Sequence, residues 1–482
     1  MAITTKTFIA GILITLGSSA FSQGYNVTLH TPNYKSGLAY LTFYYGKNLN
    51  IQDSAIINGK GTAVFARKEK LEPGIYSVIF PGKSKLVDFL VDKQQVITIK
   101  ADTSDLINKL EITGSKENIL FEEYQKFIAS KSNSLFLAQQ AFSKSKSKAD
   151  SLENEKKYRN LNKELIDYRE KIIADHPTAM LAVLFSAMKE PVVLSQTPHT
   201  KEDSINNYEY YKQHYWDGIS FMDDRIIRTP FFLPKLERYF RDILVQAPDT
   251  IIKESDYLLL LARNNPGMYK FMINWLTDEY INPRYMGQDA VFVHLFEKYH
   301  ATGVSTWLNK KQMKTISDRA YMLMSNLLGN KAADLNMVDT GGKVSKLYNL
   351  DANYTVVVFW DPTCSHCKEQ IPRLDSIYKA KWKSEGVKIY AVLSENEIPK
   401  WMDFIHEHKL TGWTNVYQTP ALKKEEEKSQ IAGYRQLYDV TQTPTIYLLD
   451  KEKRIIAKKL TILQFDDVLQ MKIKNNPSII TR

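Results

Sequence analysis

The stretch VVVFWDPTCSHCKEQIPRL, residues 356–374, contains both cysteines of this 482-residue chain, Cys364 and Cys367. An apolar run that ends at Trp360 precedes the tripeptide Asp-Pro-Thr, which predicts a buried strand followed by a turn. Apolar side chains then recur at helical spacing, at Ile371, Leu374, Ile377 and Tyr378. We therefore expect a helix that begins at Cys364. A thiol in that position lies near unpaired N–H groups and the positive end of the helix dipole, which lower its pKa.

Three roles are open to two thiols so close together: a structural disulfide, half of a zinc site, or a redox pair. A structural zinc site takes four ligands, and the chain has no second cysteine pair, so no metal is expected. A purely structural disulfide is disfavoured, because closing so short a loop constrains the unfolded chain little. We favour a redox pair that forms a Cys364–Cys367 disulfide, with Cys364 as the accessible attacking thiol and Cys367 as the sheltered resolving thiol. His366 is expected to tune the Cys364 thiolate, and no cofactor is expected.

The periodicity of the chain predicts a multidomain protein with three parts. Residues 24–114 contain short runs of β-branched and aromatic residues between turn residues, which predicts an all-β module, an antiparallel sandwich or barrel of about seven strands. Residues 115–328 show helical spacing, which predicts an all-α domain of eight to ten helices. Residues 329–482 alternate strand-like and helical segments, which predicts an α/β domain with a mixed sheet covered by helices on both faces.

The first residues, 1–22, have the layout of a secretory signal peptide: a lysine, a short apolar run and then small residues. An uncleaved anchor is the alternative. We expect an exported protein in the periplasm or cell envelope, with no integral membrane span in the mature chain. The net charge of +10 comes from lysines spread among glutamates, so nucleic acid is not an expected partner.

About residues 330–474 resemble the thioredoxin superfamily, particularly its TlpA/ResA-like branch of exported thiol–disulfide oxidoreductases. The resemblance rests on FWDPTCSHC, on Pro372 five residues after the second cysteine, and on YDVTQTPTIYLLD, residues 438–450. It implies a thioredoxin-like fold with a cis peptide bond before Pro444, which would face the sulfur atoms as part of the catalytic site. Trp360 and Thr443 are expected to contact the substrate.

The sequence departs from the resembled pattern at two positions near the cysteines. Val358 stands where thioredoxin has a buried aspartate, and Gln370 stands where the ResA-like branch commonly has a glutamate. Glu369 is adjacent but should point elsewhere on the helix. The sequence therefore does not identify a carboxylate that could accept the proton of Cys367. The charged stretch LKKEEEKSQ, residues 422–430, is expected to be a solvated insertion.

The expected function is disulfide exchange on protein thiol or disulfide substrates, with a redox recycling partner that restores the thiols. One alternative is an envelope binding or scaffold protein whose thioredoxin-like domain is a redox sensor without turnover. A thiol peroxidase is a third interpretation, and it is disfavoured because Cys367 is placed as a resolving partner suited to disulfides.

Overall fold

The computed structural model describes residues 24–83, 85–195, 197–395 and 397–475. The signal peptide expected at residues 1–22 lies outside these residues. The chain divides into two compact units, the first ending at Ile243 and the second beginning at Leu244. This division falls inside the region expected to be one helical domain, so the boundaries near residues 114 and 328 stay predictions.

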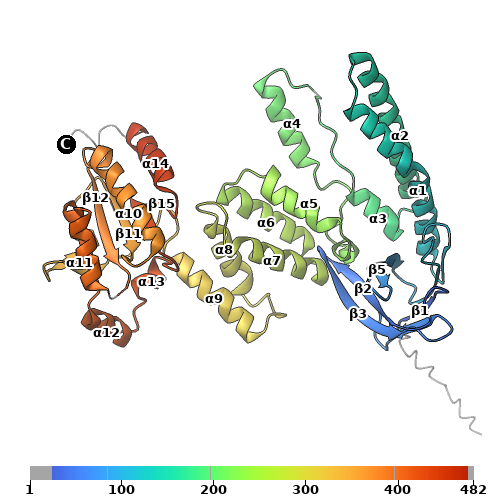
Figure 1. Cartoon of the computed structure of the whole chain (residues 1–482), viewed down its shortest axis with the longest axis horizontal. Helices are drawn as coiled ribbons and strands as arrows, with labels where there is room; N and C mark the ends of the chain where they lie inside the picture. The colour runs from blue at the N-terminus through green and yellow to red at the C-terminus, as the bar shows by residue number, and fades with distance from the viewer. Residues whose placement is uncertain (1–23, 84, 196, 396, 476–482) are drawn as a thin grey trace, which may run out of the picture. The chain divides into compact units, whose positions relative to one another are not determined.

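The N-terminal module consists of two four-stranded sheets, shown in blue in Figure 1. The sheet orders are β4-β1-β7-β8 and β3-β2-β5-β6. Its strands are β1 (Asn26–His30), β2 (Leu38–Tyr45), β3 (Asn48–Ile56), β4 (Thr62–Ala66), β5 (Gly74–Ile79), β6 (Leu86–Val91), β7 (Val96–Ala101) and β8 (Leu110–Thr113). Alternate residues of both sheets, such as Phe65 and Phe89, enter one shared core, so the module is a sandwich.

The antiparallel prediction is wrong at one pair, because β1 and β7 are parallel. After β1 the chain forms β2 and β3 of the other sheet, β4 beside β1, and β5 and β6 of the other sheet, and then returns beside β1 as β7 in the same direction. A crossover connection of this kind joins parallel neighbours, whereas a tight hairpin joins antiparallel ones. The module also contains an eighth strand, β8, where the sequence predicted about seven.

The helices of the first unit follow the module. They are α1 (Lys116–Ser143), α2 (Lys148–Asp175), α3 (Met180–Ala187), α4 (Lys201–Gln213), η1 (Asp224–Arg228), α5 (Phe232–Arg238) and η2 (Tyr239–Ile243). Ser115 and Ser147 cap the first two helices, each accepting a hydrogen bond from a backbone N–H of the first turn. The Asn118 side chain is fully buried and binds the backbone of Leu90, which fixes the start of α1 against β6.

The second unit begins with helices α6 (Pro248–Ala262), α7 (Pro266–Tyr280), α8 (Asp289–Leu295), η3 (Phe296–His300) and α9 (Lys310–Met324). Both α6 and α7 start with a proline at their first turn, where the missing N–H costs nothing. Among the described residues the region expected to be helical contains nine α-helices, within the predicted range. No helix of the described residues is long and apolar enough to cross a membrane.

A seven-stranded mixed sheet forms the rest of the second unit, with strand order β10-β9-β13-β12-β11-β14-β15. The strands are β9 (Asn336–Asp339), β10 (Val344–Lys346), β11 (Tyr354–Trp360), β12 (Val387–Leu393), β13 (Thr414–Tyr417), β14 (Thr445–Leu449) and β15 (Ile455–Lys458). The helices are η4 (Leu347–Asn349), α10 (Ser365–Ile377), η5 (Tyr378–Trp382), α11 (Ile398–Glu407), η6 (Leu410–Gly412), α12 (Pro420–Lys428), α13 (Tyr434–Leu437) and α14 (Ile462–Asn475).

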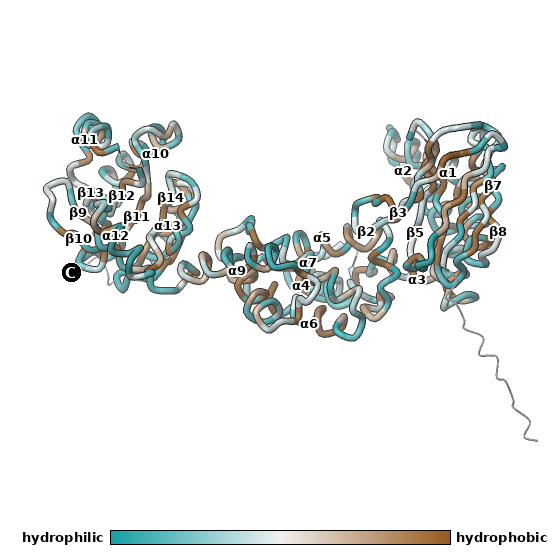
Figure 2. Tube along the Cα trace, turned by 90° about the horizontal axis from the view of Figure 1, so that it is seen from below, coloured by the Kyte–Doolittle hydropathy of each residue, from teal (hydrophilic) through white to brown (hydrophobic). Residues whose placement is uncertain are grey.

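The central strands of this sheet contain many hydrophobic residues (Figure 2), and these pack on both faces of the sheet. Val358 and Trp360 of β11 enter a core shared with α10, α11 and α14, whereas Val357 and Phe359 enter a second core on the opposite face. A strand buried on both faces is a continuous apolar run, which is what residues 354–360 show. The mixed sheet covered on both faces is confirmed.

Helices α8 and α9 are joined to the sheet by buried charges. The ammonium group of Lys458, at the end of β15, forms an ion pair with Asp289 and donates to the backbone and side-chain oxygens of Asn326 at 2.5 and 2.7 Å. The Arg319 guanidinium binds Asp439 at 2.6 Å. Buried charges are stable only when they are paired, so these contacts make α8 and α9 part of the same packed unit as the sheet.

Candidate active site

Cys364 occupies the N-cap of α10, as the sequence predicted. The turn between β11 and α10 is held by Asp361, whose carboxylate accepts hydrogen bonds from the Thr363 backbone N–H and hydroxyl, both at 2.8 Å. The Cys364 N–H donates to the Asp361 carbonyl oxygen at 3.2 Å. An aspartate that binds its own backbone two residues on is a common way to close a turn. The Asp-Pro-Thr tripeptide therefore positions the first thiol at the helix terminus.

The two thiols lie in different environments. Both are free, Cys364 is partly exposed, and Cys367 is fully buried one turn inside α10. Burial acts to raise the pKa of Cys364, but hydrogen bonds from the Cys367 backbone, the Thr443 and Cys367 side chains and the His366 backbone outweigh it, so its pKa lies below the ordinary value. Burial raises the pKa of Cys367 to about 12. The Cys364 thiol therefore ionises more readily than an ordinary cysteine, whereas the Cys367 thiol stays protonated.

The loop before β14 brings Thr443 and Pro444 to the thiols. The Cys364 Sγ atom lies 3.4 Å from the Thr443 carbonyl oxygen, with the thiol as donor. The Thr443–Pro444 peptide bond is cis, which confirms that expectation. Thr443 is half-buried, so part of it remains accessible beside Cys364.

His366 and Trp360 lie differently from what the sequence suggested. The His366 side chain is exposed, and its contribution to the Cys364 thiolate comes from its backbone. Trp360 is completely buried, with its ring centroid 5.1 Å from that of Phe404. The prediction that Trp360 contacts substrate disagrees with this placement, because the residue points from β11 into the core beneath α10 and α11. Successive side chains of a strand point to opposite faces of the sheet, and this alternation directs the Trp360 side chain into the core.

The charged groups near the pair are placed as follows. Glu369 points away from the thiols and forms an ion pair with Arg373 at 2.8 Å, as expected for an exposed pair one helical turn apart. Val358 lies in the apolar core, where it offers no proton acceptor. Among the described residues, no group of three or more histidine, cysteine, aspartate or glutamate side chains is arranged to hold a metal ion.

Two stretches of the chain match known families. Residues 328–458 match the AhpC/TSA family, and residues 25–121 match a domain of unknown function, DUF4369. The chain is 24% identical over 131 residues to the thiol-disulfide oxidoreductase ResA of Bacillus cereus, a match that covers 27% of this chain and 68% of that protein. The ResA of Bacillus anthracis is 25% identical over the same length and with the same coverage.

Solved structures give related matches. A thioredoxin-like protein from Bacteroides caccae is 22% identical, with a TM-score of 0.46, and the match covers 59% of this chain and 98% of that one. A domain of a possible thiol-disulfide isomerase from Cytophaga hutchinsonii is 36% identical, with a TM-score of 0.27, covering 32% of this chain and 97% of that one. The C-terminal part of this chain, residues 328–458, belongs to the thioredoxin superfamily as a TlpA/ResA-like domain.

Proposed function

We propose that this protein is an exported thiol–disulfide oxidoreductase that acts on protein substrates through Cys364 and Cys367. The observation that carries the proposal is the asymmetry of the pair: Cys364 is accessible with a lowered pKa, and Cys367 is buried with a raised pKa. Disulfide exchange needs a thiolate that attacks and a protected thiol that resolves. The matched relatives named thiol-disulfide oxidoreductase support the same activity.

In the reductive direction, the Cys364 thiolate attacks one sulfur of a substrate disulfide. A mixed disulfide forms, the substrate S–S bond breaks, and the released substrate thiolate takes a proton from solvent. Cys367 then loses its proton and attacks Cys364 Sγ. The mixed disulfide breaks, the Cys364–Cys367 disulfide forms, and the second substrate thiolate leaves and is protonated. The substrate has gained two electrons from the enzyme. A dithiol recycling partner then supplies two electrons that reduce the Cys364–Cys367 disulfide. The reverse sequence oxidises a substrate dithiol.

Thr443 and Pro444 are proposed to shape the contact with substrate beside Cys364. Their support is position: the Thr443 carbonyl oxygen is 3.4 Å from the attacking sulfur, so a bound polypeptide would meet this loop as its disulfide meets Cys364. The proposed export rests on the signal-peptide pattern of residues 1–22 and on the resemblance to an exported branch of the superfamily.

A turnover assay tests the proposal. The purified protein is given a disulfide-bonded protein substrate and a dithiol electron donor, and substrate thiols are counted over time. We expect many cycles for the wild type and none for Cys364→Ser, whereas Ser365→Ala, at the exposed neighbouring position, keeps its activity. If the wild type reacts only once per molecule while the donor keeps its thiols reduced, the protein is a redox sensor without turnover and the proposal fails.

A further inference from the structure

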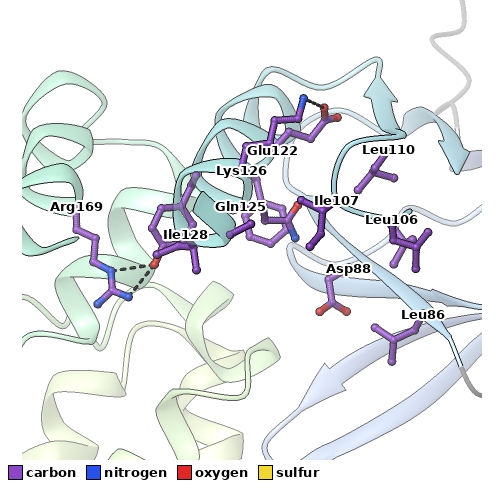
Figure 3. A pocket seen from close by; sticks show the side chains of 14 residues that line it. Leu86, Asp88, Leu106, Ile107, Leu110, Glu122, Gln125, Lys126, Ile128 and Arg169 are labelled. Atoms are coloured by element: carbon purple, nitrogen blue, oxygen red, sulfur yellow. Dashed lines mark hydrogen bonds and ion pairs between the residues drawn. The ribbon is translucent and has the colours of Figure 1, made fainter. Parts of the chain in front are cut away.

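A cavity of about 530 Å³ lies in the first unit, whereas both cysteines belong to the second (Figure 3). It is bounded by β6, by the segment that leads into β8, and by α1. Its walls are mainly apolar and are formed by Leu86, Val87, Leu106, Ile107, Leu110 and Phe121. Two of these side chains are strongly exposed, Leu86 at 41% and Ile107 at 54%. An apolar, concave and open surface of this size is typical of a binding site.

One wall of this cavity, which we call the β6 pocket, is the edge of a sheet. Strand β6 is the last in the order β3-β2-β5-β6, and in the described structure it pairs with β5 alone. In an antiparallel pair, alternate residues direct their N–H and C=O groups toward the partner strand or away from it. Which residues of β6 point away from β5 therefore decides whether the edge can accept another strand.

Three hydrogen bonds establish this register, two at Leu90 and one at Ser77. The backbone N–H and C=O of Leu90 both bind the Asn118 side chain at 2.7 Å, so they point away from β5. Ser77, which faces Asp88 across the pair, accepts the Thr42 hydroxyl with its carbonyl oxygen at 3.0 Å and so points toward β2. By the period of two, the backbone groups of Asp88 and Leu86 point away from β5 as well. No hydrogen bond between described residues occupies them.

The edge is thus closed at one end and open at the other. Asn118 acts at Leu90 as a strand would, supplying one acceptor and one donor to the backbone. Beyond it, the N–H and C=O groups of Asp88 and Leu86 point away from β5, and both residues line the apolar cavity. Unpaired edge groups are a template for an additional strand, and natural proteins usually protect them. This combination of open edge and apolar wall is the arrangement used to bind extended peptides by strand addition.

The charges in the β6 pocket favour one kind of occupant. The Asp88 carboxylate accepts a hydrogen bond from the Ser77 hydroxyl and has no cationic partner among the described ion pairs. The other charged groups that line the pocket are already engaged. Glu122 accepts the Ile112 N–H at 2.5 Å and forms an ion pair with Lys126 at 3.9 Å, and Arg169 donates to the Tyr124 hydroxyl at 2.7 and 2.9 Å (Figure 3). A basic side chain placed across from Asp88 would form a cross-strand ion pair on the same face.

We propose that the β6 pocket binds a short extended polypeptide segment that carries apolar side chains and a lysine or arginine. The segment pairs with the open edge at Leu86 and Asp88, its apolar side chains enter the cavity, and its basic side chain lies opposite Asp88. A cavity of this volume holds about three or four residues. As a strand, such a segment extends by about 3.3 Å per residue. The site is separate from the thiols and does not depend on the proposed redox activity.

The test uses the full chain and three labelled peptides. One has seven residues, with valine at the second and sixth positions, lysine at the fourth and threonine elsewhere, so that both valines and the lysine lie on one face of the strand. A second has glutamate in place of lysine, and a third repeats the first with N-methylated backbone. Fluorescence anisotropy gives Kd for each. We expect the lysine peptide to bind at least about tenfold more tightly than either of the others, a difference of about 1.4 kcal/mol. Equal affinities for the lysine and N-methylated peptides would overturn strand addition, and no measurable binding of any peptide would overturn the site.

Variants separate the contributions of the pocket. Asp88→Asn should remove the preference for lysine over glutamate, and Ile107→Ser should weaken the lysine peptide by about tenfold. Ile56→Ser is the matched control, because Ile56 is an exposed apolar residue, at 74%, on the opposite edge strand β3. Hydrogen exchange supplies a second measurement: bound peptide should slow exchange at the amides of Leu86 and Asp88. Unchanged exchange there, or equal losses in the Ile56 control, contradicts the proposal. Cys364→Ser should bind as the wild type does.

Discussion

The Sγ atom of Cys364 lies 3.4 Å from the carbonyl oxygen of Thr443, although the two residues are 79 positions apart in the sequence. This contact joins the terminus of α10 to the loop before β14. It places the more reactive thiol beside backbone that a bound polypeptide could meet. The redox chemistry that we propose depends on this juxtaposition.

The first prediction concerns the ionisation of the two thiols. Because hydrogen bonds lower the pKa of Cys364, its alkylation rate should rise with pH and level off below the pH at which an ordinary thiol does so. Cys367, whose pKa burial raises to about 12, should stay unlabelled near neutral pH. Mass spectrometry of the reduced protein after iodoacetamide treatment across a pH series measures both. Similar labelling of the two thiols at pH 7 would refute the assignment of roles.

The second prediction separates the imidazole of His366 from its backbone. The exposed side chain predicts that His366→Ala changes the pKa of Cys364 little, whereas His366→Pro, which removes the N–H, should raise it. Proline is tolerated in the first turn of a helix, so the fold of α10 should survive. The redox potential, measured against glutathione, should fall in the proline variant, since a less stable thiolate favours the disulfide. If alanine lowers the potential as much as proline does, the imidazole is the group that acts.

The third prediction concerns the buried ion pair of Lys458. Asp289→Asn should lower the free energy of unfolding by about 3 kcal/mol, because it leaves a buried ammonium without its counter-charge. Asp318→Asn is the control: it breaks an exposed pair with Lys314 and should cost less than about 1 kcal/mol. Chemical denaturation of both variants gives the comparison. Equal losses would mean that the Lys458 contact adds nothing to stability.

The fourth prediction concerns where the catalytic part of the chain begins. Lys458 and Asp439 bind Asp289 in α8, Arg319 in α9 and Asn326 just after α9. A fragment of residues 244–482 keeps these partners, and a fragment of residues 329–482 loses them. We expect both to fold, with a lower Tm for the shorter one. Calorimetry measures the Tm of each fragment. Equal Tm values would place the start of the catalytic domain near residue 329.

Local sequence signals predicted the core of the site well. The helix that begins at Cys364, the burial of Cys367 and the apolar faces of β11 follow from spacing that acts within a few residues. The cis bond before Pro444 was expected from the resemblance to the thioredoxin superfamily, to which the motif YDVTQTPTIYLLD contributes, and not from a local signal.

Features set by long-range packing were harder to predict. The side chain of Trp360 lies in the core because α10 and α11 cover the end of β11, and the apolar run alone does not show whether its last residue is covered. The parallel pairing of β1 with β7 depends on the path of the whole module. The stretch expected to be a solvated insertion forms α12, in which no residue is buried, because lysine and glutamate are good helix formers without an apolar face. The partners of Lys458 come from residues far along the chain.

Trapping with Cys367→Ser tests the central claim most directly. The reduced variant is mixed with a disulfide-bonded protein, quenched with acid, and analysed by intact mass and peptide mapping. Without the resolving thiol, the account predicts a stable mixed disulfide between the substrate and Cys364, which a dithiol releases. No adduct should form with the Cys364→Ser, Cys367→Ser double variant. An adduct that forms as readily through Cys367 in Cys364→Ser, or the absence of any adduct in Cys367→Ser, would contradict the account.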